Sequence, residues 1–124
     1  MDLKKHLEKL SGIKGYLGSG VFTPNGEMLE GTSMISGIHQ ELAGAAINDT
    51  LLHAQDMTED IGMGRADFLQ IDSDMGIVII RNYNDDENDV HFHTILYLRK
   101  DGNIAMGKLL LKKAIENLAQ ELIL

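Results

Sequence analysis

Cysteine and tryptophan are absent from this chain of 124 residues, and proline occurs once. The absence of cysteine excludes disulfides, thiol nucleophiles and thiolate metal ligands, and it fits a reducing compartment, so we expect a cytoplasmic protein. No apolar run approaches the roughly 18 residues that a membrane-spanning helix needs. The N-terminal segment MDLKKHLEKL carries charges where a signal peptide has an unbroken apolar stretch. The sequence predicts neither a membrane span nor a signal peptide.

Positive charge is also absent from the middle of the chain. No Lys or Arg lies between Gly15 and Gly64, and the formal net charge of the whole chain is −8. Nucleic-acid binding draws on clustered Lys and Arg, so this balance argues against it. The same stretch contains seven acidic residues, which are Glu27, Glu30, Glu41, Asp49, Asp56, Glu59 and Asp60.

The first and last parts of the chain, in contrast, are mildly basic. Lysines cluster in residues 4–14 and again in residues 108–113. If these segments are helices on the face of a sheet opposite to the acidic segment, the molecule has an acidic side and a basic side. Solvated surface charge without any partner is the simpler interpretation.

The length of the chain predicts one domain over residues 1–124, which buries about two-thirds of its unfolded surface. The first half reads as a helix, a hairpin and a second helix. Apolar residues recur at helical spacing in residues 2–13. Pro24-Asn25-Gly26 is typical of a tight turn in which Asn and Gly supply positive φ angles, and it would join two strands. These strands are predicted at 16–23 and 27–34, and the middle helix at about 38–62.

The second half reads as three strands and a last helix. Strands are predicted at 68–72, 76–82 and 91–99, with a polar loop at 84–89, and the last helix begins near Ile104. Strand 76–82 is apolar on both faces, as expected for a strand that is covered from both sides. The order αββαβββα indicates an α+β fold: a five-stranded antiparallel sheet with one helix on one face and two on the other.

The middle helix carries two apolar groups on a helical wheel. The first group is predicted to face the sheet. The second interleaves with Asp49 and Asp56 and has no obvious partner inside a domain of this size, so it is a candidate interface. The first group is Ala43, Ile47, Ala54, Met57 and Ile61, and the second is Ile38, Leu42, Ala45 and Leu52.

One segment nearly matches a phosphate-binding loop. Gly102, Gly107 and Lys108 have the spacing of GxxxxGK[ST], but Leu109 stands where that motif needs a hydroxyl to hold Mg²⁺. Too little chain follows Lys108 for the βα units of a nucleotide-binding sheet. We therefore predict that Asp101-Gly102-Asn103 is a turn and helix cap, and that the protein uses no cofactor.

A metal site has modest support. His91 and His93 share one face of a strand, at the spacing that a pair of metal ligands could use, and the loop that precedes them is acidic. That loop lacks the Gly and the oxygen spacing of a calcium-binding loop. Half-exposed sheet residues are the better interpretation, and we expect no metal.

Catalytic patterns are weaker still. Asp72 and Asp74 are typical of a turn rather than of a paired acid and base. Arg65, just past the middle helix, could act as a finger in the active site of a partner. The sequence contains no nucleophile elbow and no nucleophile with a matching base, so we expect a protein that is not an enzyme.

The segment from His91 to Leu124 resembles the end of a roadblock/dynein-light-chain domain. It reads as a strand, the turn DGN and the helix start IAMGKLLLKKA, and in that family a last strand runs through a small Asn/Gly turn into a basic-then-apolar helix. The order of elements over nearly the whole chain agrees with this resemblance, which implies a profilin/longin-like fold.

The resemblance also implies a function. Roadblock domains form homodimers in which edge strands join two sheets and the middle helices lie side by side. Members bind small Ras-like GTPases as scaffolds or activators, or serve as light chains in larger assemblies. We therefore expect a homodimeric interaction module that regulates a small Ras-like GTPase, and the small residues around Gly44 would let paired helices approach. The expected interface residues are Ile38, Leu42, Ala45, Asp49, Leu52, Asp56, Phe68 and Gln70.

Two alternatives stay open. The chain could be a small-ligand or signal-sensing domain with a related architecture, or a purely structural, light-chain-like subunit. A pocket between sheet and helix lined by polar groups would favour the sensing domain. A flat platform of two helices would favour GTPase binding.

Overall fold

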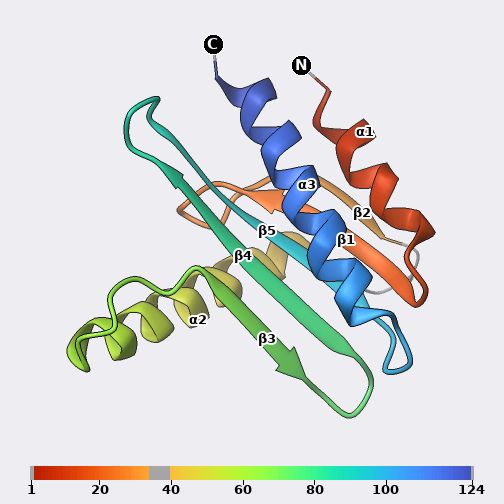
Figure 1. Cartoon of the computed structure of the whole chain (residues 1–124), viewed down its shortest axis with the longest axis horizontal. Helices are drawn as coiled ribbons and strands as arrows, with labels where there is room; N and C mark the ends of the chain where they lie inside the picture. Colours follow the sequence, from red (N-terminus) through yellow and green to blue (C-terminus); the bar gives the residue numbers. More distant parts are fainter. Residues whose placement is uncertain (1, 34–39, 124) are drawn as a thin grey trace.

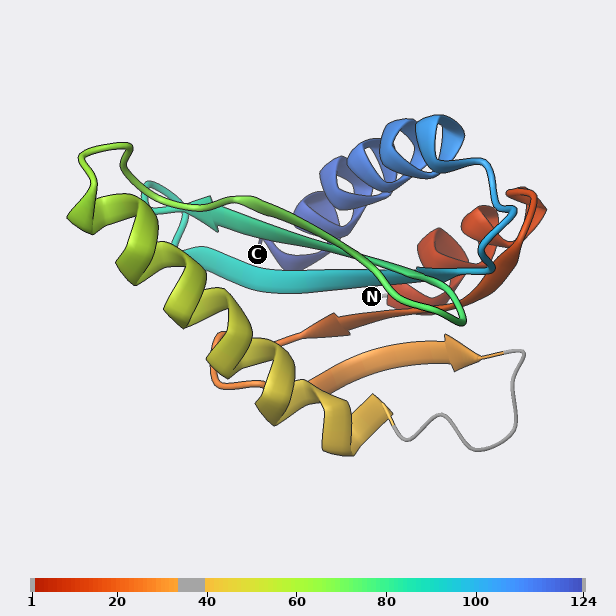
Figure 2. The same cartoon turned by 90° about the horizontal axis from the view of Figure 1, so that it is seen from below.

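The computed structural model describes residues 2–33 and 40–123, with the backbone alone at 33 and 40–42. Its centre is a five-stranded antiparallel sheet in the order β2-β1-β5-β4-β3. Helix α2 lies on one face of the sheet, and α1 and α3 lie on the other (Figures 1 and 2). The elements are α1 (Leu3–Glu8), a 3₁₀ turn (Lys9–Gly12), β1 (Tyr16–Phe22), β2 (Met28–Ser33), α2 (Gln40–Asp60), β3 (Phe68–Asp72), β4 (Ile77–Asp85), β5 (Val90–Leu98) and α3 (Ile104–Leu122). The predicted αββαβββα fold is confirmed.

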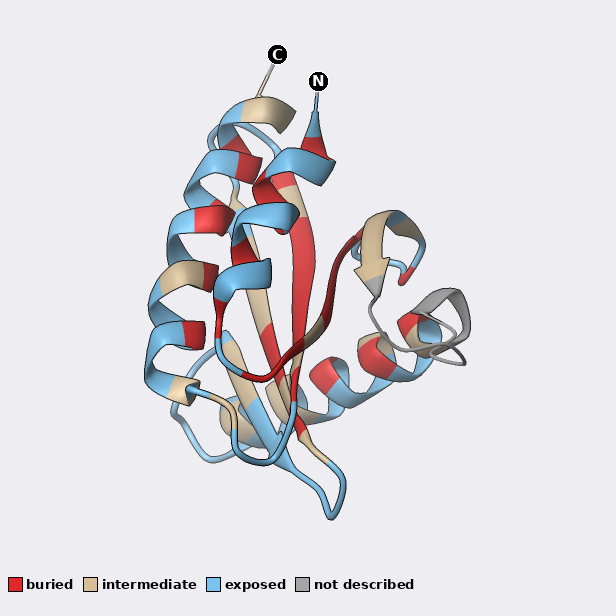
Figure 3. Cartoon of the chain, turned by 90° about the vertical axis from the view of Figure 1, so that its right-hand side faces the viewer, coloured by how far each residue is buried: buried red, intermediate tan, exposed pale blue. Residues whose placement is uncertain are grey.

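The larger core lies between the sheet and helices α1 and α3. Leu111, Ala114 and Leu118 are buried on the side of α3 that faces the strands. Figure 3 shows a row of buried positions along this helix. They pack with strand side chains such as Ile79 and Leu96, both fully buried. This apolar stripe recurs at helical spacing, which is why the helix could be predicted from the sequence.

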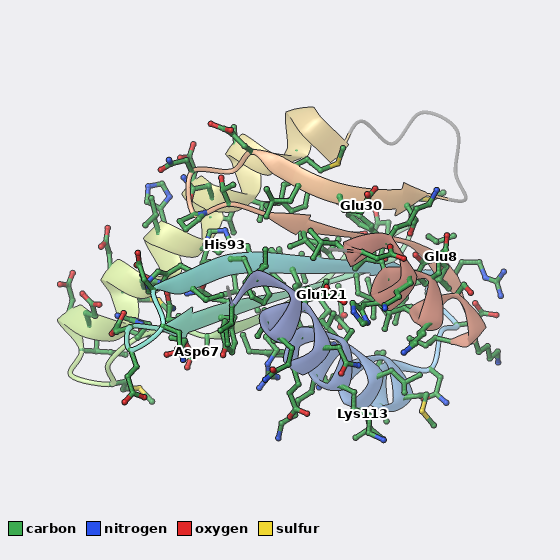
Figure 4. The ribbon with its side chains drawn as sticks, turned by 90° about the horizontal axis from the view of Figure 1, so that it is seen from above. Glu8, Glu30, Asp67, His93, Lys113 and Glu121 are labelled. Carbon is green, nitrogen blue, oxygen red and sulfur yellow. The ribbon has the colours of Figure 1, made fainter. Side chains whose placement is uncertain are left out.

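A polar contact joins α1 to α3 beside this core. His6 is buried, and its Nε2 lies 3.1 Å from Oε1 of Glu121. Lys5 Nζ lies 3.7 Å from the same oxygen. The hydrogen bond with His6 is the main reason why the pKa of Glu121 is below its ordinary value. Figure 4 shows Glu121 on the part of α3 that neighbours α1.

A smaller core lies under α2. Ile47 packs with Phe22, Ile80 and Ile95, which come from three different strands. Leu51, one turn further along α2, is 1% exposed and is a core residue that the helical wheel did not assign to the inward group. Ala43 and Ala54 are partly buried on the same side, so the first part of the predicted inward group is confirmed.

The prediction that Met57 and Ile61 face the sheet is wrong. Their side chains are 59% and 62% exposed. The last turns of α2 extend past the strands, as Figure 1 shows, so a side chain that points in the direction of the sheet meets no strand there. The exposed apolar surface of α2 is therefore longer than the sequence indicated.

Several predicted boundaries also differ. The first helix is α-helical only to Glu8 and then tightens into the 3₁₀ turn, where Ser11 Oγ donates to the carbonyl of Glu8. Strand β4 runs on to Asp85, so the acidic loop is shorter than predicted. The start of the predicted middle helix, including Ile38, lies outside the described residues.

The turn between β1 and β2 has one positive φ angle rather than two. Gly26 has φ 88°, whereas Asn25 stays at negative φ. The Gly26 N–H donates to Thr23 O and the Thr23 N–H donates to Glu27 O, so a glycine in the left-handed region follows the turn. The hairpin is confirmed, but its predicted Asn-Gly turn type is wrong.

Gly44 of α2 packs directly on this turn. A Cβ on Gly44 would collide with the carbonyl oxygen of Gly26, and a Cβ on Gly26 would meet Gly44 O at 2.7 Å. The glycine at 44 is thus needed for the contact between α2 and its own hairpin. Its neighbours Ala45 and Ala46 are exposed.

Candidate functional site

The outer face of α2 is acidic and partly apolar. Ala45, Asp49 and Asp56 are exposed, and Leu52 is 49% exposed, so these predicted interface residues all lie on the surface. Met57 and Ile61 extend the apolar part toward the end of the helix. No Lys or Arg occurs within Gln40–Asp60. The side chain of Leu42, a further predicted interface residue, lies outside the described part of the chain.

A cavity of about 180 Å³ adjoins this face at Leu52 and lies between α2 and the ends of the strands. Helix α2 contributes Asn48 and Gln55, and the following loop contributes Arg65. Its whole lining is Pro24, Asn48, Leu51, Leu52, Gln55, Arg65, Asn82, Asn84 and His93. The cavity is therefore mostly polar, with an apolar wall from Leu51, Leu52 and Pro24.

The strands bring three polar side chains to this cavity by simple alternation. Asn82 pairs with His93 and Asn84 pairs with His91 in the register between β4 and β5. Positions 82 and 84 lie on the same face of β4 as Ile80, which packs under α2. Figure 4 shows His93 on β5, on the side toward α2.

Most of these polar groups have no partner among the residues that the structure describes. The side-chain amides of Asn48, Gln55 and Asn82 make no hydrogen bond with another described residue, and Arg65 forms no ion pair with one. His93 is 6% exposed, and its Nδ1 is buried without a partner among the described residues. This burial lowers the pKa of the His93 imidazole below its ordinary value, so the ring is neutral at pH 7.

His91 has a different environment from His93. Its Nδ1 lies 2.8 Å from Oδ1 of Asn84, and its Nε2 lies 3.4 Å from Asp89 and 3.6 Å from Asp86. Asp89 takes a positive φ angle of 54° in the turn that precedes β5. Within residues 2–33 and 40–123, no three His, Asp or Glu side chains are grouped closely enough to hold a metal ion.

The Gly102–Lys108 segment is a helix entry. Backbone N–H groups that a phosphate loop would turn toward a ligand are already bonded: Gly102 to Arg99 O, Asn103 to Lys14 O and Gly107 to Asn103 O. The Asn103 side chain caps α3 by accepting from the Met106 N–H. Lys108 Nζ lies 5.4 Å from the ring centre of Phe68. The glycines and the lysine thus have structural roles.

The remaining candidates from the sequence do not come together. Asp72 ends β3 and accepts a hydrogen bond from Gln70 Nε2. Asp74 is exposed in the turn before β4, where Ser73 bonds to Gly76 O. Within the described part of the chain, this turn contributes neither to the exposed face of α2 nor to the cavity beneath it.

Comparison with known proteins rests on structure. No protein-family profile matches the sequence, and no curated protein is significantly similar to it. A Roadblock/LC7 domain from Streptomyces avermitilis superposes with a TM-score of 0.85 at 8% identity over 100% of both chains. The gliding protein MglB from Thermus thermophilus gives 0.80 at 15% identity, covering 95% of this chain and 86% of its own. MglC from Myxococcus xanthus gives 0.63 at 20% identity, covering 98% and 99%.

This chain has the Roadblock/LC7 fold. The finding confirms the resemblance that the last strand, turn and helix indicated. In this roadblock sheet β3 is an edge strand, as predicted for Phe68 and Gln70. Gln70 is exposed, but Phe68 is partly buried toward α3, where the guanidinium of Arg81 lies 5.7 Å from its ring centre.

The polar cavity under α2 was missed in the sequence, although two patterns pointed to it. Asn48 and Gln55 are seven residues apart, which places them on one face of a helix two turns apart. Asn82 and Asn84 continue the alternation of strand 76–82 beyond its predicted end, on the face that carries His93 across the register. Because the predicted strand ended at Asn82, this relation was missed.

Within the described chain, no helix is both long and apolar enough to cross a membrane.

Proposed function

We propose that this roadblock protein is a homodimeric, non-enzymatic regulator of a small Ras-like GTPase. The observation that carries the proposal is the exposed face of α2, where apolar side chains are surrounded by acids on a helix without Lys or Arg. Exposed apolar side chains ringed by charge are typical of protein interfaces. The similarity to a roadblock domain, to MglB and to MglC supports the proposal through the fold they share.

Dimerisation is proposed through the same helix together with β3. An edge strand leaves a row of backbone N–H and C=O groups unpaired, and pairing with a second copy would satisfy them. A further solved structure, described as "MglB with tetrameric arrangement", matches this chain at 15% identity with a TM-score of 0.82. An interface that buries about 800 Å² per protomer would be of standard size.

The test uses two leucines of nearly equal exposure on opposite faces. Leu52 on α2 is 49% exposed and Leu109 on α3 is 51% exposed. Leu52→Asp places a charge beside Asp49 and Asp56, so we expect it to weaken dimerisation or binding of a GTP-loaded Ras-like GTPase at least tenfold. Leu109→Asp is the control and should change neither.

Light scattering and a binding titration with the GTPase measure the two effects. Wild-type protein should scatter as about twice 13.7 kDa at micromolar concentration. A wild-type chain that is monomeric and binds no Ras-like GTPase would refute the proposal. Equal effects of Leu52→Asp and Leu109→Asp would show that α2 is not the interface.

One observation favours the ligand-sensing alternative as a second function. A polar-lined cavity between a helix and the sheet is the feature that would favour a sensing domain. The cavity and the exposed apolar surface of α2 meet at Leu52, which belongs to both, so a small ligand could influence the binding of a protein partner.

A further inference from the structure

We propose that the cavity beneath α2 binds a small organic carboxylate that also carries a hydroxyl group. The inference develops the ligand-sensing function proposed above, and it does not depend on a GTPase. It rests on the charge, the unpartnered groups and the size of the cavity.

The charge of the lining selects an anion. Arg65 is the cation of the cavity, and no Asp or Glu lines it within the described residues. The guanidinium forms no ion pair there, and guanidinium groups bind carboxylates through two parallel hydrogen bonds. Because the neighbouring His93 is neutral at pH 7, the site offers one positive charge, which matches a monoanion better than a phosphate dianion.

The backbone before Arg65 positions its side chain. Helix α2 ends with the Met63 N–H bonded to Thr58 O and the Gly62 N–H bonded to Glu59 O. This pair of backbone hydrogen bonds, with Gly62 at φ 80°, forms a Schellman motif at the end of the helix. Gly64 also has a positive φ angle, and no atom lies within 4 Å of a Cβ built there. Gly62 and Gly64 are needed for their positive φ angles rather than for close packing. With these angles the backbone turns back, and Arg65 lies over the ends of the strands.

The unpartnered groups select a hydroxyl. The amides of Asn48, Gln55 and Asn82 can each donate and accept, and none is satisfied by another described side chain. The neutral imidazole of His93 also lines the cavity, where a ring nitrogen can donate or accept. A hydroxyl group also donates and accepts, so it complements amides and imidazole. Leu51 and Leu52 would contact the carbon atoms of the ligand.

The size limits the ligand to a few carbon atoms. A volume of 180 Å³ corresponds to about six water molecules of the liquid. Glycolate, lactate and glycerate fit within this space, and all three are monoanions that join one carboxylate to a hydroxyl. A nucleotide is larger than this volume.

Direct titration of the full chain tests the proposal. The three hydroxy acids are added to ¹⁵N-labelled protein, and the side-chain amide signals of Asn48, Gln55 and Asn82 are followed by NMR. At least one acid should shift these signals saturably, with a dissociation constant in the millimolar range or below. Two matched probes isolate the groups: propionate lacks the hydroxyl of lactate, and lactamide lacks its charge. Propionate should bind about three- to tenfold more weakly than lactate, and lactamide at least about tenfold more weakly.

Two arginine variants provide the protein control. Arg65→Gln should weaken binding at least about tenfold, because it removes the charge-assisted hydrogen bonds. Arg99→Gln removes an exposed arginine that pairs with Asp101 just beyond the end of β5, and it should leave the affinity unchanged. The proposal is wrong if none of the three acids binds saturably at tens of millimolar, or if Arg65→Gln and wild type bind equally. A failure to bind any GTPase would leave these results untouched.

Discussion

At the scale of single residues, alternation along β4 and β5 decides which polar groups meet under α2. The sequence correctly placed His91 and His93 on one strand face. It predicted half-exposed sheet residues rather than metal ligands, and this is wrong for His93, which is 6% exposed. In the structure they lie opposite Asn84 and Asn82, and amides rather than carboxylates accompany His93. Strand periodicity predicts which side chains share a face, whereas the neighbouring strand that completes a site depends on register.

His93 gives a prediction for the pH dependence of stability. Burial lowers the pKa of its imidazole below the ordinary 6.5. The unfolded chain therefore takes up a proton at a higher pH than the folded protein does. The contribution of the neutral His93 to the free energy of unfolding has its full value above pH 6.5. The free energy of unfolding should therefore fall as the pH drops from 6.5 toward the folded pKa. Urea denaturation at intervals between about pH 7.5 and pH 5 measures this slope.

The variant His93→Gln should flatten that slope. Carboxylates whose pKa values are lowered, such as Asp85 and Asp101, act below their ordinary value of 3.8 and so outside this window. The control His53→Gln changes an exposed histidine on α2 and should keep the wild-type slope. Wild-type stability that stays constant down to pH 5 would contradict the burial of a neutral His93.

At the scale of elements, helix ends were harder to predict than helix faces. The wheel gave the inward direction of α2 correctly at Ala43, Ile47 and Ala54. It failed at Met57 and Ile61, because periodicity reports a direction and not how far the opposing sheet extends. The ends of β4 and of the first helix differ for a related reason, since hydrogen bonds with neighbours set them.

The start of α3 gives a second prediction. Asn103→Ala removes the side-chain acceptor for the Met106 N–H and should lower the free energy of unfolding by about 1 kcal/mol. Lys108→Ala removes a cation near the Phe68 ring and should cost less, about 0.5 kcal/mol. Chemical denaturation measures both changes. Tight ATP or GTP binding by wild type that is lost in Lys108→Ala would instead restore the phosphate-loop interpretation.

At the scale of the whole molecule, charge is divided between the two faces of the sheet. The acids Asp49, Asp56 and Glu59 are exposed on α2, and Lys112 and Lys113 are exposed on α3. Figure 4 shows Lys113 pointing away from the sheet on the α3 side. The sequence predicted this division, because a stretch without Lys or Arg coincides with one helix and the fold places that helix alone on its face.

The last prediction concerns which of these faces meets the proposed GTPase. Charges at the rim of an interface act mainly on the association rate, and salt screens them. Asp56→Lys with Glu59→Lys should therefore slow association and weaken its dependence on salt, with a smaller change in the dissociation rate. Lys112→Glu with Lys113→Glu reverses the same number of charges on the opposite face and should do little. Stopped-flow kinetics at several salt concentrations separate the two. If the lysine changes slow association and the acidic changes do not, the partner docks on α3, and the interface proposed for α2 is wrong.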